Sequence, residues 1–297
     1  MITVTGLTKR YDDFTALDTM NMHVESGSIY GLIGPNGSGK TTLIRTLMGV
    51  LKAEGGEILY DGEPVYENPD VKRRIGYVPD DFFTANNDSL NSAAKFYRGM
   101  YPSWNQGRFE EMCKAFKLNP KQKIRRFSKG MKKQAKFILV MSQMPDYLLL
   151  DEPIDGLDPL MRKRVWKYII EDVADRNISV LVSSHNLKEL EDIVDHIGIL
   201  HKGKMMMEAD CDDLKGELHR LQVAFKDKTA MPEDLNVLYE ETHGSVTRMI
   251  VRGNLDEIEE KFRALDPILF DVLPVSLEEV FIYELGSEEE ELRDLIF

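Results

Sequence analysis

Hydrophobic residues in the second half of the chain form short runs separated by amphipathic stretches, and this alternation predicts a layered α/β fold. Apolar runs at 147–150, 178–183 and 197–200 enclose helical patterns at 161–174 and 187–194. Short apolar strands separated by helices commonly pair in parallel, with the helices covering the faces of the sheet. We therefore expect a mostly parallel sheet with helices packed on it.

The first half of the chain has a different pattern. Strands are expected at 2–7, 20–24, 28–33, 57–60 and 74–78, with glycine-containing turn signals on both sides of the fourth. From about residue 88 to residue 145 the hydrophobic spacing becomes mostly helical. This stretch predicts a helical subdomain between the early strands and the later alternating region.

The end of the chain has short elements of its own. A strand is expected at 247–251, with helices at 255–265 and 277–285. Four consecutive glutamates at 288–291 predict a solvated segment. Together these patterns predict a small α+β appendage.

Charge is distributed unevenly, and the change near residue 210 suggests a domain boundary. Residues 1–210 contain 29 Lys and Arg against 29 Asp and Glu, whereas residues 211–297 contain 9 against 22, which accounts for the net charge of −13. We expect one larger domain over 1–215, with its helical subdomain at about 88–145, and an acidic accessory domain over 216–297. An acidic surface repels phosphate, so no nucleic-acid partner is expected.

The composition is that of a soluble globular protein, with 42% hydrophobic and 30% charged residues among 297. No apolar run approaches the roughly 20 residues of a membrane-spanning helix, and Thr3 and Lys9 interrupt any N-terminal leader. Cys113 and Cys211 are isolated, which is typical of ordinary thiols in a reducing cytoplasm.

A glycine-rich loop between the strand at 28–33 and a helical pattern at 42–50 is the most informative motif. It matches G-x-x-x-x-G-K-[ST], in which backbone N–H groups and a helix N-terminus surround polyphosphate. The lysine can reach the β- and γ-phosphates, and the following hydroxyl can bind Mg²⁺. The predicted nucleotide-binding residues are Gly34, Pro35, Asn36, Gly37, Ser38, Gly39, Lys40, Thr41 and Thr42.

Two of the apolar strands end in polar residues. Asp151 follows the strand at 147–150 and is suited to bind Mg²⁺ with Thr41, and Glu152 comes next as a candidate general base. His185 follows the strand at 178–184 and is placed to sense a γ-phosphate. For each strand end a purely structural role, such as capping a helix, is the alternative.

In this order the motifs resemble the nucleotide-binding subunit of ATP-binding-cassette (ABC) transporters, over about residues 1–210. The loop at 34–41 resembles the Walker A motif, 148–151 resembles Walker B, and 153–158 resembles the D-loop. By this resemblance Glu152 matches the catalytic glutamate, His185 the switch histidine, Tyr11 an aromatic residue that stacks on adenine, and Ser128 and Gly130 the signature motif.

The resemblance implies a P-loop NTPase fold with an antiparallel β subdomain and a helical subdomain, and it implies ATP and Mg²⁺ as ligands. In this family two such domains close on ATP, and a separate transmembrane permease converts that closure into transport. The implied partners are a second ATP-binding subunit, expected to be a copy of this chain, and a transmembrane permease. This chain is expected in the cytoplasm, peripheral on the inner face of the cell membrane. Residues 274–281 also resemble subunits of ABC-2-type exporters.

Two positions depart from the family pattern. The family places a glutamine after a strand like 75–78, whereas this chain has Asp80, which could bind Mg²⁺ but would repel ATP in the absence of metal. We therefore expect a steep Mg²⁺ dependence. An Asp80→Gln variant with the same Mg²⁺ response as the wild type would contradict this expectation. In the signature motif Lys129 replaces a glycine, and we hypothesise that it offsets Asp80 across the dimer.

Residues 121–136 form a basic run with eight Lys or Arg and no acid. Three interpretations stay open: a solvated face, a contact with the anionic membrane surface, or a contact with the acidic C-terminal region.

Two alternative functions are considered beside a transport ATPase. A soluble ABC protein acting on ribosomes or DNA fits less well, because the chain has one cassette and no coiled-coil pattern between Thr41 and Ser128. A nucleotide-dependent regulator without turnover is suggested by the altered signature motif.

Overall fold

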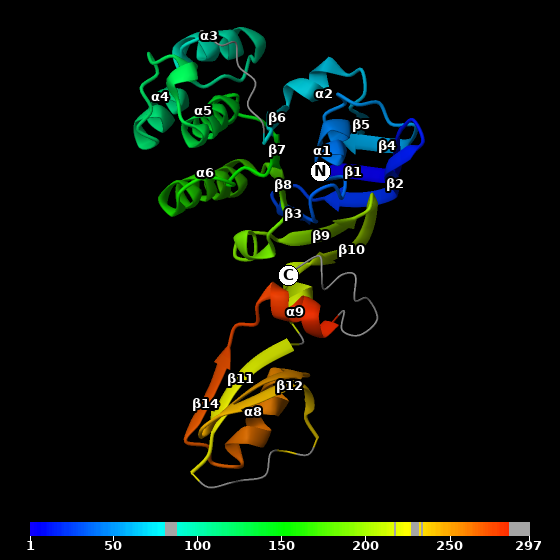
Figure 1. The fold of residues 1–297 in the computed structure, drawn as a ribbon, viewed down its shortest axis with the longest axis vertical. Coiled ribbons are helices and arrows are strands. Elements are labelled where there is room, and N and C mark those ends of the chain that lie inside the picture. The colour runs from blue at the N-terminus through cyan, green and yellow to red at the C-terminus, as the bar shows by residue number, and fades with distance from the viewer. Residues whose placement is uncertain (81–87, 217, 227–231, 233, 285–297) are drawn as a thin grey trace. The chain divides into compact units, whose positions relative to one another are not determined.

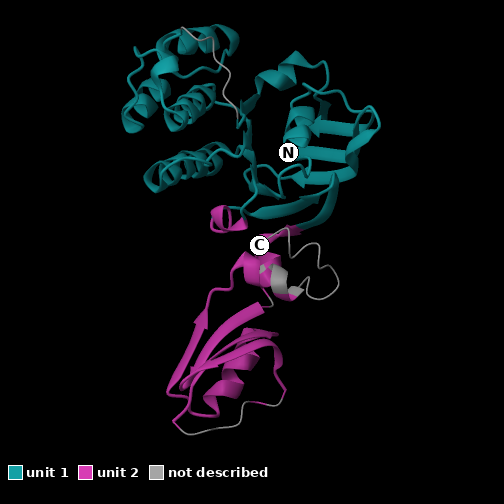
Figure 2. Ribbon diagram, viewed as in Figure 1, with its two compact units in different colours: residues 1–186, 193–208 teal, residues 187–192, 209–297 magenta. Residues whose placement is uncertain are grey.

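The computed structural model describes residues 1–80, 88–216, 218–226, 232 and 234–284 (Figure 1). The chain divides into two compact units, residues 1–186 with 193–208, and residues 187–192 with 209–297 (Figure 2). The expected domain boundary between residues 215 and 216 stays a prediction. The second compact unit takes up the chain a few residues earlier, at residue 209. The glutamates at 288–291 lie outside the described residues.

A six-stranded sheet forms the centre of the first unit. Its order is β10-β9-β3-β8-β7-β6, and β9, β3, β8, β7 and β6 run parallel. All residues of β3, β7 and β8 are buried, as expected for parallel strands covered on both faces. The strands are β3 Ile29–Ile33, β6 Ile75–Val78, β7 Tyr147–Asp151, β8 Ser179–Ser184, β9 His196–His201 and β10 Lys204–Asp210.

An antiparallel sheet of order β2-β1-β4-β5 packs on the same core. Its strands are β1 Ile2–Tyr11, β2 Phe14–Val24, β4 Gly55–Tyr60 and β5 Glu63–Pro64, and the short helix α2 Pro69–Arg73 follows. Helix α1 Lys40–Leu47 contacts both β2 and β7. The two sheets and α1 therefore share one hydrophobic core, which fixes the loop before α1 relative to the ends of the parallel strands.

The expected helical subdomain is present, and Figure 1 shows its helices grouped beside β6 and β7. It contains α3 Leu90–Met100, α4 Gln106–Ala115, the 3₁₀ turn η1 Ile124–Arg126 and α5 Lys129–Ser142, and α6 Pro159–Arg176 follows β7. Polar side chains cap these helices by accepting hydrogen bonds from backbone N–H groups of the first turn. Ser128 Oγ, for example, accepts one from Met131 N. An ion pair of 2.6 Å between Arg108 and Asp172 joins α4 to α6.

The prediction of a helix at 187–194 is wrong. The segment contains only the 3₁₀ turn η2 Leu187–Glu189. Leu187, Leu190 and Val194 are buried at helical spacing, which explains the prediction. However, Asp195 already pairs with Ile29 through both its backbone N–H and its carboxylate, so the chain must extend into β9 before a helix can grow.

The second unit has an antiparallel sheet of order β12-β13-β11-β14. Leu221, Val223 and Met249 pack with α8 residues Ile258 and Phe262 in one buried cluster. A separate cluster joins Leu218 and Ile250 to α9. The elements are α7 Cys211–Lys215, β11 Leu218–Ala224, β12 Asn236–His243, β13 Val246–Arg252, α8 Leu255–Arg263, β14 Leu269–Leu273 and α9 Leu277–Glu284.

Across the described parts of both units, no helix combines the length and the apolar composition that crossing a bilayer requires.

Candidate functional site

The loop from Gly34 to Gly39 joins β3 to α1 and depends on its glycines. Gly37 and Gly39 have φ angles of +84° and +113°, which side-chain-bearing residues rarely adopt. At Gly34 an added Cβ would lie 2.3 Å from the Leu200 carbonyl oxygen. The backbone can therefore turn tightly here and leave its inner side open to a ligand.

Lys40 lies at the start of α1 and its side chain crosses the loop. It is 6% exposed, and its Nζ donates to the carbonyl oxygens of Gly34 at 2.6 Å and Pro35 at 3.2 Å. Burial lowers the pKa of Lys40, and the negative charges of Glu152 and Asp151 oppose that effect. The structure thus holds a buried ammonium beside the loop, where a phosphate could pair with it.

Asp151 ends β7 and is held by two hydroxyl groups. Thr41 Oγ1 donates to Asp151 Oδ2 at 2.8 Å, and Ser183 Oγ donates to Oδ1 at 2.8 Å. The residue is 2% exposed. A carboxylate beside a threonine hydroxyl offers hard oxygen atoms, which fit the few protein ligands that Mg²⁺ takes when phosphates and waters supply the rest.

Glu152 has strained backbone geometry, with a φ of +47°. Its Oε2 lies 2.9 Å from His185 Nδ1, and its Oε1 lies 3.5 Å from Lys40 Nζ. Glu152 Oε1 and Ser38 Oγ are buried and have no hydrogen-bond partner among the described residues. Buried polar atoms without partners mark places where a ligand or water completes the site.

A cavity of about 420 Å³ brings most of the predicted residues together. Its lining extends from the phosphate loop to the ends of β6 and β7, and it includes two residues of β2 that sequence reasoning did not predict. The lining residues are Phe14, Ala16, Pro35, Asn36, Gly37, Gly39, Lys40, Thr41, Thr42, Asp80, Asp151 and Glu152.

Six predicted residues lie outside this lining, two of them, Gly34 and Ser38, within the phosphate loop itself. Tyr11 pairs with Phe14 across the β1–β2 turn and is contacted by Lys9 Nζ, 5.3 Å from its ring centre. His185 reaches the cavity through Glu152. Ser128 and Gly130 begin α5, and their predicted role belongs to the cavity of a second subunit.

Phe14 is the aromatic residue that the structure places at the cavity. Its side chain is 65% exposed, which is unusual for a large apolar residue. The only signal in the sequence was its position three residues after Tyr11.

Asp80 has a partner that sequence reasoning missed. Lys133 Nζ donates to Asp80 Oδ1 at 2.7 Å. Lys129, the partner hypothesised across the dimer, lies 4.0 Å from Asp155 in this chain. Lys133 thus offers a counter-charge to Asp80 within the same chain, and the expected steep Mg²⁺ dependence stays a prediction. Lys133 belongs to the basic run at 121–136, and its burial shows that this run is not uniformly solvated.

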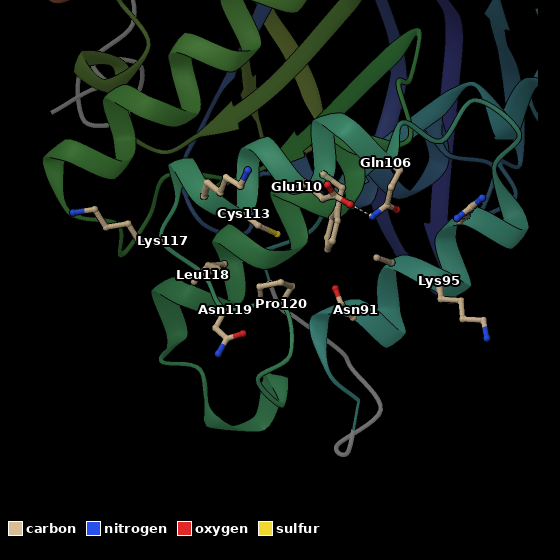
Figure 3. Close-up of a pocket in the computed structure, with 13 residues that line it drawn as sticks. Asn91, Lys95, Gln106, Glu110, Cys113, Lys117, Leu118, Asn119 and Pro120 are labelled. Atoms are coloured by element: carbon tan, nitrogen blue, oxygen red, sulfur yellow. Dashed lines mark hydrogen bonds between the residues drawn. The ribbon is translucent and has the colours of Figure 1, made fainter.

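A second cavity, of about 910 Å³, lies between α3 and α4 and contains none of the predicted site residues (Figure 3). Phe109, Cys113 and Leu118 are buried in its wall, and Lys95 and Lys117 are exposed at its edge. Burial, together with the nearby Glu110 charge, raises the pKa of Cys113 to about 11. This thiol is therefore protonated at neutral pH, in keeping with an ordinary cysteine.

Comparison with known proteins gives consistent matches. A family model described as ABC transporter matches residues 17–155. The ABC transporter ATP-binding protein YtrB of Bacillus subtilis (strain 168) is 32% identical over 289 residues, or 97% of this chain and 99% of YtrB. The bacitracin transport ATP-binding protein BcrA of Bacillus licheniformis is 37% identical over 222 residues, or 72% of this chain and 71% of BcrA.

Solved structures match nearly three quarters of the chain. An ATP-binding subunit of an ABC transporter has a TM-score of 0.68 at 26% identity, covering 73% of this chain and 92% of that one. A dimeric bacterial ABC transporter cassette has a TM-score of 0.65 at 21% identity, covering 71% and 99%. At that identity the second match supports the fold alone.

Proposed function

The chain belongs to the ATP-binding subunits of ABC transporters, which hydrolyse ATP to power transport, and on this premise we propose how its own residues perform that task. We infer that Lys40 and the amides of the loop at 34–42 bind the phosphates of ATP. Thr41 and Asp151 would hold Mg²⁺. The single observation that carries the proposal is the cavity at which Lys40, Thr41, Asp151 and Glu152 meet.

Glu152 is the proposed general base. As the oxygen of a water molecule bonds to the γ-phosphorus, Glu152 accepts a proton from that water, and the bond to the bridging oxygen breaks to release ADP. The contact with His185 orients the carboxylate, and Oε1, which accepts no hydrogen bond from the described residues and lies 3.5 Å from Lys40 Nζ, is the oxygen left to accept the proton. When bound, Mg²⁺ neutralises charge on the phosphates. An intact and oriented Glu152 favours turnover over a purely regulatory role.

The proposed assembly is a homodimer on a membrane permease, at the inner face of the cell membrane, acting in export. Ser128 and Gly130 would complete the cavity of the partner copy from the N-terminus of α5. Support for export comes from the names of relatives such as the bacitracin transport protein and the lantibiotic transport protein SrtF of Streptococcus pyogenes, 31% identical over 229 residues.

Glu152→Gln tests this proposal. We expect phosphate release to fall at least about 100-fold, because the amide cannot accept the proton, while ATP binding persists. Phosphate release and binding of a fluorescent ATP analogue, both measured on purified protein, separate the two effects.

Glu191→Gln is the control, since Glu191 accepts a hydrogen bond from Leu277 N within the second unit and does not line the cavity. Equal phosphate release in the Glu152→Gln variant and the wild type would contradict the proposal. Purification from membranes with cross-linking would identify the permease.

A further inference from the structure

Lys133, in the second turn of α5, is a buried cation close to the nucleotide cavity. Its side chain is 5% exposed, although it belongs to a run of basic residues without acids. Lysine is almost never fully buried unless its charge is paired, because the unpaired ammonium loses its hydration. The partners of Lys133 therefore indicate why the charge is there.

Three segments of the same chain supply these partners. Lys133 Nζ donates to Asp80 Oδ1 at 2.7 Å and to the Glu152 carbonyl oxygen at 3.2 Å, and it lies 3.7 Å from Asp155 Oδ2. Asp80 follows β6, Glu152 follows β7, and Asp155 precedes α6. One ammonium group thus joins the helix that begins at Ser128 to the ends of both strands that border the cavity.

The charges around the cavity give this contact a consequence for binding. Asp80, Asp151 and Glu152 line it with three carboxylates, against the single ammonium of Lys40. Polyphosphate is itself strongly anionic, so an uncompensated Asp80 would oppose it at short range. Lys133 is not part of the lining, but it binds the one carboxylate that is also half exposed.

We propose that Lys133 is a positioning residue for nucleotide binding: it holds Asp80 Oδ1 and compensates its charge, so that the cavity accepts polyphosphate before metal arrives. This inference rests on the function proposed above. Lys129 does not share the role, since it is 75% exposed and lies 4.0 Å from Asp155. The chain therefore carries a carboxylate at the position of the family's glutamine together with its own counter-charge.

The test is a double-mutant cycle of Lys133→Gln and Asp80→Asn, read by binding of a fluorescent ATP analogue in EDTA and across a Mg²⁺ titration. We expect Lys133→Gln to weaken metal-free binding about tenfold and to make binding steeply Mg²⁺-dependent. In the Asp80→Asn background the same substitution should weaken metal-free binding no more than about threefold, because the Asp80 carboxylate no longer opposes polyphosphate.

Lys132→Gln is the matched control, because it removes the same charge from the adjacent residue of α5. It should leave metal-free affinity within about twofold of the wild type. Lys133→Arg keeps the charge and should retain most of the binding. The inference would be overturned if Lys133→Gln caused an equal loss in the wild-type and Asp80→Asn backgrounds, or if Lys132→Gln caused the same loss as Lys133→Gln.

If the Lys133→Gln variant does not fold, the Asp80→Asn variant alone tests the inference. It removes the carboxylate nearest to Lys133 Nζ and leaves Asp155 Oδ2 at 3.7 Å, so metal-free binding should tighten about threefold, and unchanged affinity would overturn the inference. A wild-type protein that binds no nucleotide would instead refute the proposed function. Normal wild-type binding with no effect of Lys133→Gln would refute the inference alone.

Discussion

At the scale of single residues, Gly34 shows how little space the phosphate loop leaves. A Cβ at this position would approach the Leu200 carbonyl oxygen to 2.3 Å, whereas a Cβ at Gly37 meets nothing within 4 Å. Gly34→Ala should therefore cost about 1–3 kcal/mol of unfolding free energy, because backbone must move. Gly37→Ala should cost about 1–2 kcal/mol from its positive φ alone.

Urea unfolding of the two variants, measured without nucleotide, tests these two expected losses of unfolding free energy. A Gly34→Ala variant as stable as the wild type would mean that the loop and the end of β9 are not packed as the structure shows.

Residue types predicted the chemistry of the site more reliably than the partners of each residue. The contacts of Thr41 with Asp151 and of Glu152 with His185 follow from motifs that come at the carboxyl ends of the parallel strands β3, β7 and β8. Lys133 carried no such signal, because a lysine in a basic run is ordinarily solvated.

At the scale of secondary-structure elements, an ion pair joins the helical subdomain to α6. Asp172 is 3% exposed, lies 2.6 Å from Arg108 of α4 and bonds Arg176 one turn later at 3.0 Å. Removing one partner of a buried pair leaves an uncompensated charge, so Asp172→Asn should lower the unfolding free energy by roughly 3 kcal/mol.

The control for this prediction is Glu171→Gln, the neighbouring residue of α6, whose exposed pair with Lys167 at 3.6 Å should contribute no more than about 0.5 kcal/mol. Denaturant unfolding measures both variants, and similar losses in the two would argue against a structural role for the α4–α6 contact.

At the scale of the whole molecule, two units with separate buried clusters should respond separately to perturbation. Phe262 is fully buried in the cluster under α8 of the second unit. Phe262→Ala should destabilise that unit by about 3–5 kcal/mol. Saturating ATP should stabilise only the first unit, by about 2.7 kcal/mol at roughly 100 times the dissociation constant.

Differential scanning calorimetry with and without Mg²⁺ and ATP tests the separation. We expect the substitution to lower one transition and the nucleotide to raise the other. A single transition that both changes shift equally would show that the two units unfold as one.

The sequence by itself determined the fold class and the helical subdomain at about 88–145, and it predicted the residue types of the candidate site. These follow from local signals: the period of hydrophobic residues selects strand or helix, and G-x-x-x-x-G-K-[ST] requires one backbone shape. The same local signals failed at 187–194, where pairing of Asp195 with β3 prevents a helix.

Only the tertiary structure decided that Phe14 rather than Tyr11 lines the cavity, and that Lys133 rather than Lys129 holds Asp80. Both outcomes depend on which side of a strand or helix faces a segment distant in sequence. Lys129 and Lys133 occupy successive turns of α5, and packing against the ends of β6 and β7 buries only the second. A charge pattern along the chain does not contain that information, because burial is a property of the assembled elements.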